Sequence, residues 1–224
     1  MKSLDIDLVI FDCDGTLVDS EYVNNKSISR MLVGLGHNKF TIEYCVDYFA
    51  GCSIHDVVDA LNRLKVESPE KELEKMHLYA MDLAQKELAA IKNVPETLEK
   101  IRIPKCVASN GEHGIVREFL NITKLMQFFT EDSVFTRELV KNPKPAPDLY
   151  LHTAKQMGNI PPERCLVIED SVVGVTAGKS AGMNVIGFVG ANHHHEQSEH
   201  QLLKAGAFTI MKDFSEMLNY FNTG

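Results

Sequence analysis

Short apolar runs recur along the chain, and each ends at polar or turn-forming residues. The runs are four or five residues long. Runs this short, with little alternation of apolar and polar positions, are typical of strands that are buried on both faces of a sheet. The predicted strands are Leu8–Phe11, Lys105–Ala108, Ser133–Thr136, Cys165–Ile168, Val185–Val189 and Phe208–Met211.

Helical patterns lie between several of these predicted strands. Ile115–Leu120 follows the second strand, and Pro147–Met157 is opened by its proline and closed by Gly158. Strands that alternate with helices at this spacing form a parallel sheet with helices on both faces. The fold class is therefore predicted as α/β.

A long stretch after the first strand has a different pattern. From Ser20 to about Gln85, turn signals are sparse and apolar residues recur at helical spacing, with no strand-like run. We therefore expect residues 19–91 to form a helical insert in an α/β core made of residues 1–18 and 92–224. The hinges are expected near Asp19 and near Asn93.

Polar groups stand at or just beyond the ends of the predicted strands or in the loops behind them. They are Asp12 with Asp14, Ser109 with Asn110, Lys144, and Glu169 with Asp170. A parallel sheet brings the carboxyl ends of its strands to one edge, so these groups are expected to share one crevice.

The acidic groups predict a magnesium site. Asp12, Asp14 and Asp170 offer only oxygen ligands, which suits Mg²⁺ together with a substrate phosphate. Carboxylates this close repel one another unless a cation is present.

The remaining groups suit the transfer of a phosphoryl group. Ser109 can donate a hydroxyl hydrogen bond, Asn110 an amide hydrogen bond, and Lys144 a positive charge to phosphoryl oxygens. Asp12 can then act as a nucleophile that forms an aspartyl phosphate. Asp14 is expected to move the proton, first to the leaving oxygen and then from the attacking water.

Composition restricts the class of partner. Lysine and arginine number 23 against 31 acidic residues, which gives a net charge of -8 and argues against nucleic acid or an anionic membrane as the main partner. No signal peptide is visible, and no apolar run approaches the roughly 18 residues of a membrane span. The cysteines lack CxxC spacing and are expected to be reduced core thiols, which predicts a cytoplasmic protein. They are Cys13, Cys45, Cys52, Cys106 and Cys165.

Four motifs, in chain order, resemble those of the haloacid dehalogenase-like hydrolase superfamily. They are Asp12-Cys-Asp14-Gly-Thr16-Leu, Ser109-Asn110, Lys144, and Glu169-Asp170-Ser171-x-x-Gly174. The resemblance extends over nearly the whole chain. The helical insert looks like the cap of the branch that contains phosphoglycolate phosphatase, β-phosphoglucomutase and 6-phosphogluconate phosphatase.

This resemblance implies a Rossmann-like parallel sheet core with a helical cap inserted after the first strand. It implies that Asp12 is the nucleophile and Asp14 the general acid and base. It also implies that Mg²⁺ is held by Asp12, the Asp14 carbonyl and Asp170, with Glu169 at or just behind the metal.

The substrate contacts follow from the same resemblance, which implies that Ser109, Asn110 and Lys144 bind the phosphate group of the substrate. Gly51, Cys52 and Ser53 either contact the substrate or simply cap the following helix. The expected activity is that of a Mg²⁺-dependent phosphatase on a small phosphorylated metabolite, such as a sugar or sugar-acid phosphate. We expect a monomer or a weak homo-oligomer.

The main alternative is a phosphosugar mutase that resembles β-phosphoglucomutase. That mutase has a histidine where this chain has Asn24, and an arginine at the cap contact where this chain has Ile54. Both departures favour a hydrolase. A phospho-acceptor signalling domain would need no cap, and a catalytically inactive binding protein would not keep every catalytic position intact.

Other motifs have simpler interpretations. A calcium loop starting at Asp12 is excluded because Leu17 and Val23 stand where such a loop needs glycine and glutamate. The segment Gly178-Lys179-Ser180 lacks the first glycine of a nucleotide-binding loop and is interpreted as helix surface. The run His193–His195, with His200, is interpreted as a solvated loop.

Overall fold

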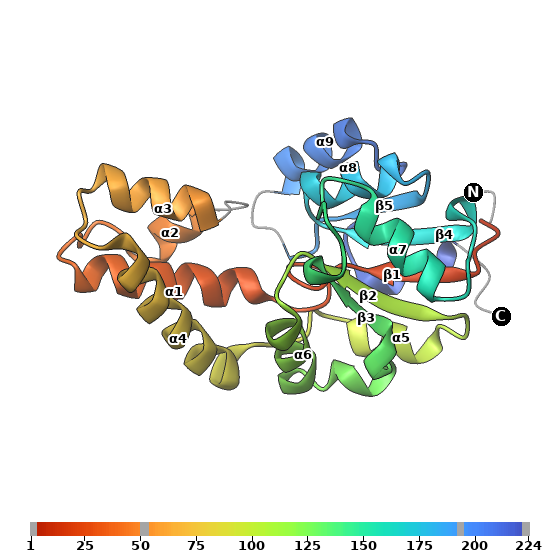
Figure 1. The fold of residues 1–224 in the computed structure, drawn as a ribbon, viewed down its shortest axis with the longest axis horizontal. Coiled ribbons are helices and arrows are strands. Elements are labelled where there is room, and N and C mark those ends of the chain that lie inside the picture. The colour runs from red at the N-terminus through yellow and green to blue at the C-terminus, as the bar shows by residue number, and fades with distance from the viewer. Residues whose placement is uncertain (1–3, 50–53, 192–194, 221–224) are drawn as a thin grey trace. The chain divides into compact units, whose positions relative to one another are not determined.

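The structure is a computed structural model that describes residues 4–49, 54–191 and 195–220. It divides into two compact units, which Figure 1 shows as ribbons. Met1–Asp19 and Ala89–Gly224 form an α/β unit, and Ser20–Leu88 form a helical unit. The helical unit covers nearly the stretch that was expected as an insert, residues 19–91.

The α/β unit contains a six-stranded parallel sheet with the order β3-β2-β1-β4-β5-β6. All six predicted strands are present, and the predicted fold class is confirmed. The strands are β1 (Leu8–Phe11), β2 (Lys105–Ser109), β3 (Val134–Thr136), β4 (Cys165–Glu169), β5 (Asn184–Phe188) and β6 (Thr209–Met211).

Several strand ends differ from the prediction by one residue. β2 and β4 each run one residue further, because Ser109 still pairs with β3 and Glu169 still pairs with β5. β5 starts one residue earlier, since Asn184 pairs with β4. Pairing with a neighbouring strand therefore decided these ends, and no single-chain pattern carries that information.

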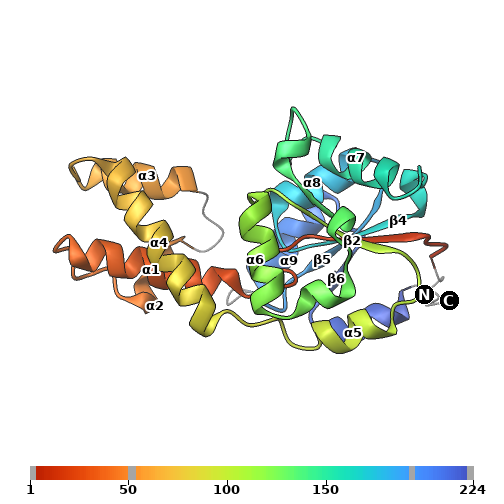
Figure 2. The same ribbon diagram turned by 60° about the horizontal axis from the view of Figure 1, so that its bottom comes forward.

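Helices cover both faces of the sheet, as predicted. α7, α8 and α9 lie on one face, and α5 and α6 lie on the other (Figures 1 and 2). These helices are α5 (Val94–Lys100), α6 (His113–Ile122), α7 (Asp148–Gln156), α8 (Val172–Ser180) and α9 (His195–Ala205). The sheet is thus buried on both sides, which explains why its strands are apolar at nearly every position.

The two connections between the units run beside each other. Val18 pairs antiparallel with Ala90, and the Ile91 amide donates to the Leu17 carbonyl at 3.0 Å. Asn93, which is expected near a hinge, lies in the α/β unit four residues after Ala89, and its side chain donates to the Asp213 carboxylate at 2.7 Å. The boundary therefore lies before Asn93, between Leu88 and Ala89.

The helical unit has a hydrophobic core of its own. Helix α1 packs against α2 and α4, and Lys26 of α1 pairs with Glu87 of α4 at 2.5 Å. Leu32, Phe40 and Leu61 are buried in this core. The helices are α1 (Ser20–Gly34), α2 (Ile42–Phe49), α3 (Ile54–Arg63) and α4 (Pro69–Glu87). Among the described residues, no helix combines the length and apolar character that a membrane span requires.

Truncating Leu61 tests this separate core. Leu61 is fully buried, so Leu61→Ala is expected to lower the free energy of unfolding by about 2–5 kcal/mol. The matched control is Leu78→Ala on α4, where the leucine is 66% exposed and the change is expected to stay within about 0.5 kcal/mol. Urea unfolding followed by circular dichroism measures both. Equal stability losses in the two variants would contradict the assignment of this core.

Candidate active site

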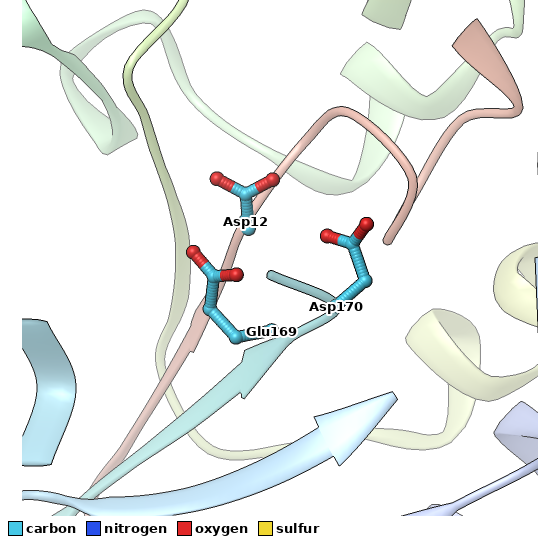
Figure 3. A group of neighbouring side chains, drawn as sticks. All are labelled: Asp12, Glu169 and Asp170. Atoms are coloured by element: carbon cyan, nitrogen blue, oxygen red, sulfur yellow. The ribbon is translucent and has the colours of Figure 1, made fainter. Parts of the chain in front are cut away.

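The strand order reverses between β1 and β4, and three carboxylates meet there. Asp12 follows β1, while Glu169 ends β4 and Asp170 comes next. Each offers an oxygen atom, and these atoms all lie within 4.8 Å of one another. Figure 3 shows the three side chains converging from the ends of the two strands. A crevice at such a reversal is where open α/β sheets bind ligands.

The turn after β1 is built against Asp170. The Cys13 carbonyl accepts hydrogen bonds from the amides of Leu17 at 2.8 Å and Val18 at 3.1 Å. Gly15 has a φ of +75°, and a Cβ there would lie 2.2 Å from Asp170 Oδ2. The Thr16 hydroxyl donates to Asp170 Oδ1 at 3.0 Å. Only glycine allows this close approach, and Thr16 then fixes the carboxylate.

Lys144 lies inside the site rather than on the surface. The residue is only 5% exposed, and its Nζ donates to Asp12 Oδ1 at 2.6 Å and to Glu169 Oε1 at 2.7 Å. Lys144 is therefore a buried, paired member of the site. An ammonium group has three donors, and these two bonds use two of them.

Charge and burial shift the ionisation of this group of side chains. Burial raises the pKa of Asp12 to about 8, an effect that Lys144 opposes and Glu169 reinforces. Burial and the carboxylates of Glu169 and Asp12 hold the pKa of Asp170 well above its usual range. Burial alone would lower the pKa of Lys144, but Asp12 and Glu169 outweigh it and hold that pKa well above its ordinary value.

The donor set fits a hard divalent cation. Three carboxylates face one ammonium group, so the cluster carries excess negative charge when all its members are ionised. A cation would offset that repulsion and bring the raised pKa values of Asp12 and Asp170 down, because a nearby positive charge favours the ionised carboxylate.

Glu169 is surrounded by protein donors. Its Oε1 accepts from Lys144 and from the Tyr150 hydroxyl at 3.0 Å, and its Oε2 accepts from the Ser171 amide at 3.0 Å and hydroxyl at 2.9 Å. A carboxylate offers about four lone-pair positions. A Cβ on Gly174 would lie 1.5 Å from Oε1, so only glycine leaves room for this arrangement. Protein donors therefore use the lone-pair positions that Glu169 could offer to a cation.

Asn110 pairs with the backbone of Lys144. Its side-chain amide donates to the Lys144 carbonyl at 2.9 Å, and its Oδ1 accepts from the Lys144 amide at 3.1 Å. The side chain therefore holds the backbone of the lysine loop with one of the two N–H donors of its amide. The sequence spacing between Asn110 and Lys144 carries no signal for this pairing.

Ser109 and Asp14 face the same small region. Ser109 Oγ accepts from the Gly111 amide at 2.9 Å, which leaves the hydroxyl hydrogen to donate. A Cβ on Gly111 would lie 3.2 Å from Ser109 Oγ and 3.5 Å from Asp14 Oδ2. Both oxygens therefore lie near the same point, just after the end of β2, and the charge of Asp14 also raises the pKa of Asp12.

Sequence reasoning missed three residues of the site. Thr16, Tyr150 and Ser171 contact its carboxylates, although their motifs or helices had been recognised. Tyr150 gave one usable signal, because a phenol on the buried face of a helix needs a hydrogen-bond partner. Burial and Glu169 hold the pKa of Tyr150 well above its ordinary value, so its hydroxyl stays a donor.

Some predicted residues cannot be placed. Gly51, Cys52, Ser53, His193 and His194 lie outside the described residues. The segment Gly178-Lys179-Ser180 lies within α8, where Gly178 is buried against the sheet, so it forms no nucleotide-binding loop. The four cysteines among the described residues are free and buried, as expected.

Comparisons with known proteins agree with this geometry. A family model for haloacid dehalogenase-like hydrolase matches residues 9–188. The chain is 31% identical over 215 residues to the 6-phosphogluconate phosphatase of Escherichia coli K12, covering 95% of this chain and 94% of that protein.

Two solved structures are also similar. A HAD family hydrolase of Deinococcus radiodurans R1, with bound phosphate and sodium, has a TM-score of 0.80 and 31% identity and covers 96% of this chain and 94% of that chain. A putative beta-phosphoglucomutase of Thermotoga maritima has a TM-score of 0.78 and 27% identity, with 96% and 97% covered. The family match spans every strand-end residue described above, and the chain belongs to the haloacid dehalogenase-like hydrolases.

Proposed function

We propose that this protein is a Mg²⁺-dependent phosphatase that hydrolyses a small phosphorylated metabolite, a sugar or sugar-acid phosphate, through an aspartyl phosphate on Asp12. One observation carries the proposal: the carboxylate of Asp12 is paired with the buried Lys144 ammonium, beside Asp170, at the point where the strand order reverses. The similarity to a 6-phosphogluconate phosphatase supports the substrate class.

The first half of the reaction transfers the phosphoryl group to the protein. A carboxylate oxygen of Asp12 attacks phosphorus, and the bond between phosphorus and the ester oxygen breaks. Asp14 gives its proton to the leaving oxygen, which departs as an alcohol. Lys144 and Ser109 donate to the phosphoryl oxygens, where negative charge must be stabilised.

The second half regenerates the nucleophile. Asp14, now ionised, accepts a proton from a water molecule while the water oxygen attacks phosphorus. The bond between phosphorus and the Asp12 oxygen breaks, so inorganic phosphate leaves and both carboxyl groups return to their starting states. One observation supports this role: a Cβ on Gly111 would lie 3.2 Å from Ser109 Oγ and 3.5 Å from Asp14 Oδ2, so both oxygens border the same point.

The metal would be held by Asp12, Asp170 and the Asp14 main-chain carbonyl. It would supply positive charge to the phosphoryl oxygens and offset the mutual repulsion of the carboxylates. Glu169, whose lone pairs are already used by protein donors, would hold Lys144 in place.

The helical unit, Ser20–Leu88, is proposed to act as a cap. A cap that closes over the substrate would exclude bulk water and supply substrate selectivity. The prediction for Gly51, Cys52 and Ser53 stays open between two roles. They contact the substrate from this unit, or they form the N-terminal cap of the helix that follows them.

A phosphosugar mutase is the second candidate, because a putative beta-phosphoglucomutase is among the similar structures. Asn24 and Ile54 weigh against it, since the resemblance to β-phosphoglucomutase implies a histidine and an arginine at these two positions of a mutase. The two activities differ in product, since a mutase retains the phosphate on the sugar and a phosphatase releases it to water.

A substrate panel tests the proposed function. Purified protein with Mg²⁺ is assayed against sugar, sugar-acid and glycolytic phosphates, with phosphate release and sugar products both measured. Release concentrated on one or two esters is expected, and EDTA should stop it. A rearranged phosphosugar without phosphate release would establish the mutase instead, and a rate indifferent to EDTA would refute the metal site.

Asp12→Asn tests the nucleophile. The amide cannot form the aspartyl phosphate, so turnover is expected to fall by roughly three orders of magnitude or more. The fold should survive, because the side chain keeps its size, and the melting temperature checks this. Substantial activity in a folded variant would remove Asp12 from the nucleophile's role.

Asp170→Asn tests the metal site through stability. Because the pKa of Asp170 is raised in the folded protein, its contribution to stability without metal is lost as the pH rises through that pKa. In EDTA, the melting temperature of the variant should therefore fall less than that of the wild type between about pH 5 and about pH 8.

Added Mg²⁺ should stabilise the wild type more than the Asp170→Asn variant. The wild type should gain about 2.7 kcal/mol at a hundredfold excess over the dissociation constant, and the variant far less. Asp82→Asn, the same change on the exposed face of α4, is the matched control and should behave as the wild type. Equal stabilisation of Asp170→Asn by Mg²⁺ would contradict Asp170 as a ligand.

A further inference from the structure

Tyr150 is fully buried and contacts both members of the ion pair between Lys144 and Glu169. It lies in the first turn of α7, six residues after Lys144 in the chain. Its ring lies under the lysine, with Nζ 4.6 Å from the ring centroid. Its hydroxyl donates to Glu169 Oε1 at 3.0 Å, the same oxygen that accepts from Lys144 at 2.7 Å.

The two contacts act on the lysine from different sides. The ring occupies the space behind the ammonium group, and its electron-rich face attracts the positive charge. The hydroxyl provides a second donor to Glu169 Oε1, so that oxygen does not depend on the lysine alone. The ammonium can then stay between Glu169 and Asp12, where it also reaches Asp12 Oδ1 at 2.6 Å.

We propose that Tyr150 is a positioning residue of this site, which acts through Glu169 to keep the Lys144 ammonium group beside Asp12 and available to a phosphoryl oxygen. The proposal rests on the proposed function for its role in turnover. Phosphate binding by the protein tests it independently of turnover.

Removing only the hydroxyl should displace the lysine. In Tyr150→Phe the ring stays, but Glu169 Oε1 loses a charge-assisted hydrogen bond inside the protein. Lys144 is then the remaining side-chain donor to that oxygen, and the attraction draws the ammonium toward Glu169 and away from Asp12. The phosphoryl group loses part of its binding as a result.

The first experiment measures the binding of inorganic phosphate by isothermal titration calorimetry, with Mg²⁺ present. The dissociation constant of Tyr150→Phe should rise about tenfold, the factor that one lost charge-assisted hydrogen bond corresponds to. With the best ester of the panel, KM should rise by a similar factor and kcat should change little, because the lysine grips the phosphoryl group before and during reaction.

Tyr220→Phe is the matched control. Tyr220 is also buried in the α/β unit, and its hydroxyl donates to the Ile210 carbonyl at 3.5 Å. This variant loses the same atom far along the chain from Lys144, and its phosphate binding should equal that of the wild type. The melting temperatures of both variants are measured alongside.

A double-mutant cycle tests whether Tyr150 acts through Glu169. In a Glu169→Gln background, the buried charge that the hydroxyl balances is gone. Tyr150→Phe should then change the phosphate dissociation constant by less than about twofold, because coupled residues are non-additive. If Tyr150→Phe still raised the phosphate dissociation constant tenfold in that background, the proposal that Tyr150 acts through Glu169 would be overturned.

The remaining outcomes are also decisive. A Tyr150→Phe variant that loses stability or its fold, with no separate change in phosphate binding, would show a packing role and overturn the proposal. A wild type that binds no phosphate would overturn it too. If the wild type binds phosphate in a Tyr150-dependent way but hydrolyses no ester, the proposed function fails while the positioning role of Tyr150 stands.

Discussion

The site depends on one buried ammonium group among carboxylates that would otherwise repel one another. Lys144 joins Asp12, after β1, to Glu169, at the end of β4, and so links the two strands at which the sheet reverses its order. Breaking a buried pair leaves an uncompensated charge, which is strongly destabilising. The same interaction that holds these strand ends together therefore also orients the nucleophile that we propose.

The loops at this edge are fixed to one another as well as to the strands. The Asn110 side chain holds the backbone of Lys144, and Glu138 accepts from the His113 amide at the start of α6. The Thr136 hydroxyl donates to the same Glu138. Loops that carry reactive groups gain precision when further hydrogen bonds limit their motion. In this protein those bonds connect the segment that follows Ser109, the last residue of β2, with the segment after β3 that carries Lys144, and both residues are proposed phosphoryl donors.

The helical unit is a separate physical body with its own core, and it joins the α/β unit through paired connections at Val18 and Ala90. The groups that we propose for the chemistry all belong to the α/β unit. Substitutions within the helical unit can therefore change a substrate surface without changing the buried ion pair. This separation of roles is consistent with one family containing relatives named for different phosphate esters.

The sequence by itself determined the strands and the parallel sheet, and it supplied the residues that we propose for the chemistry. Fully apolar runs such as Cys165–Ile168 can only be buried, and a carboxylate directly after such a run must emerge at the sheet edge. Only the tertiary structure decided how those residues pair. Asn110 reaches Lys144 across 34 positions, Thr16 reaches Asp170 across 154, and Tyr150 meets Glu169 across 19. Periodicity reports which side of an element faces the core, but contacts between distant segments are set by strand order and packing, which no local pattern encodes.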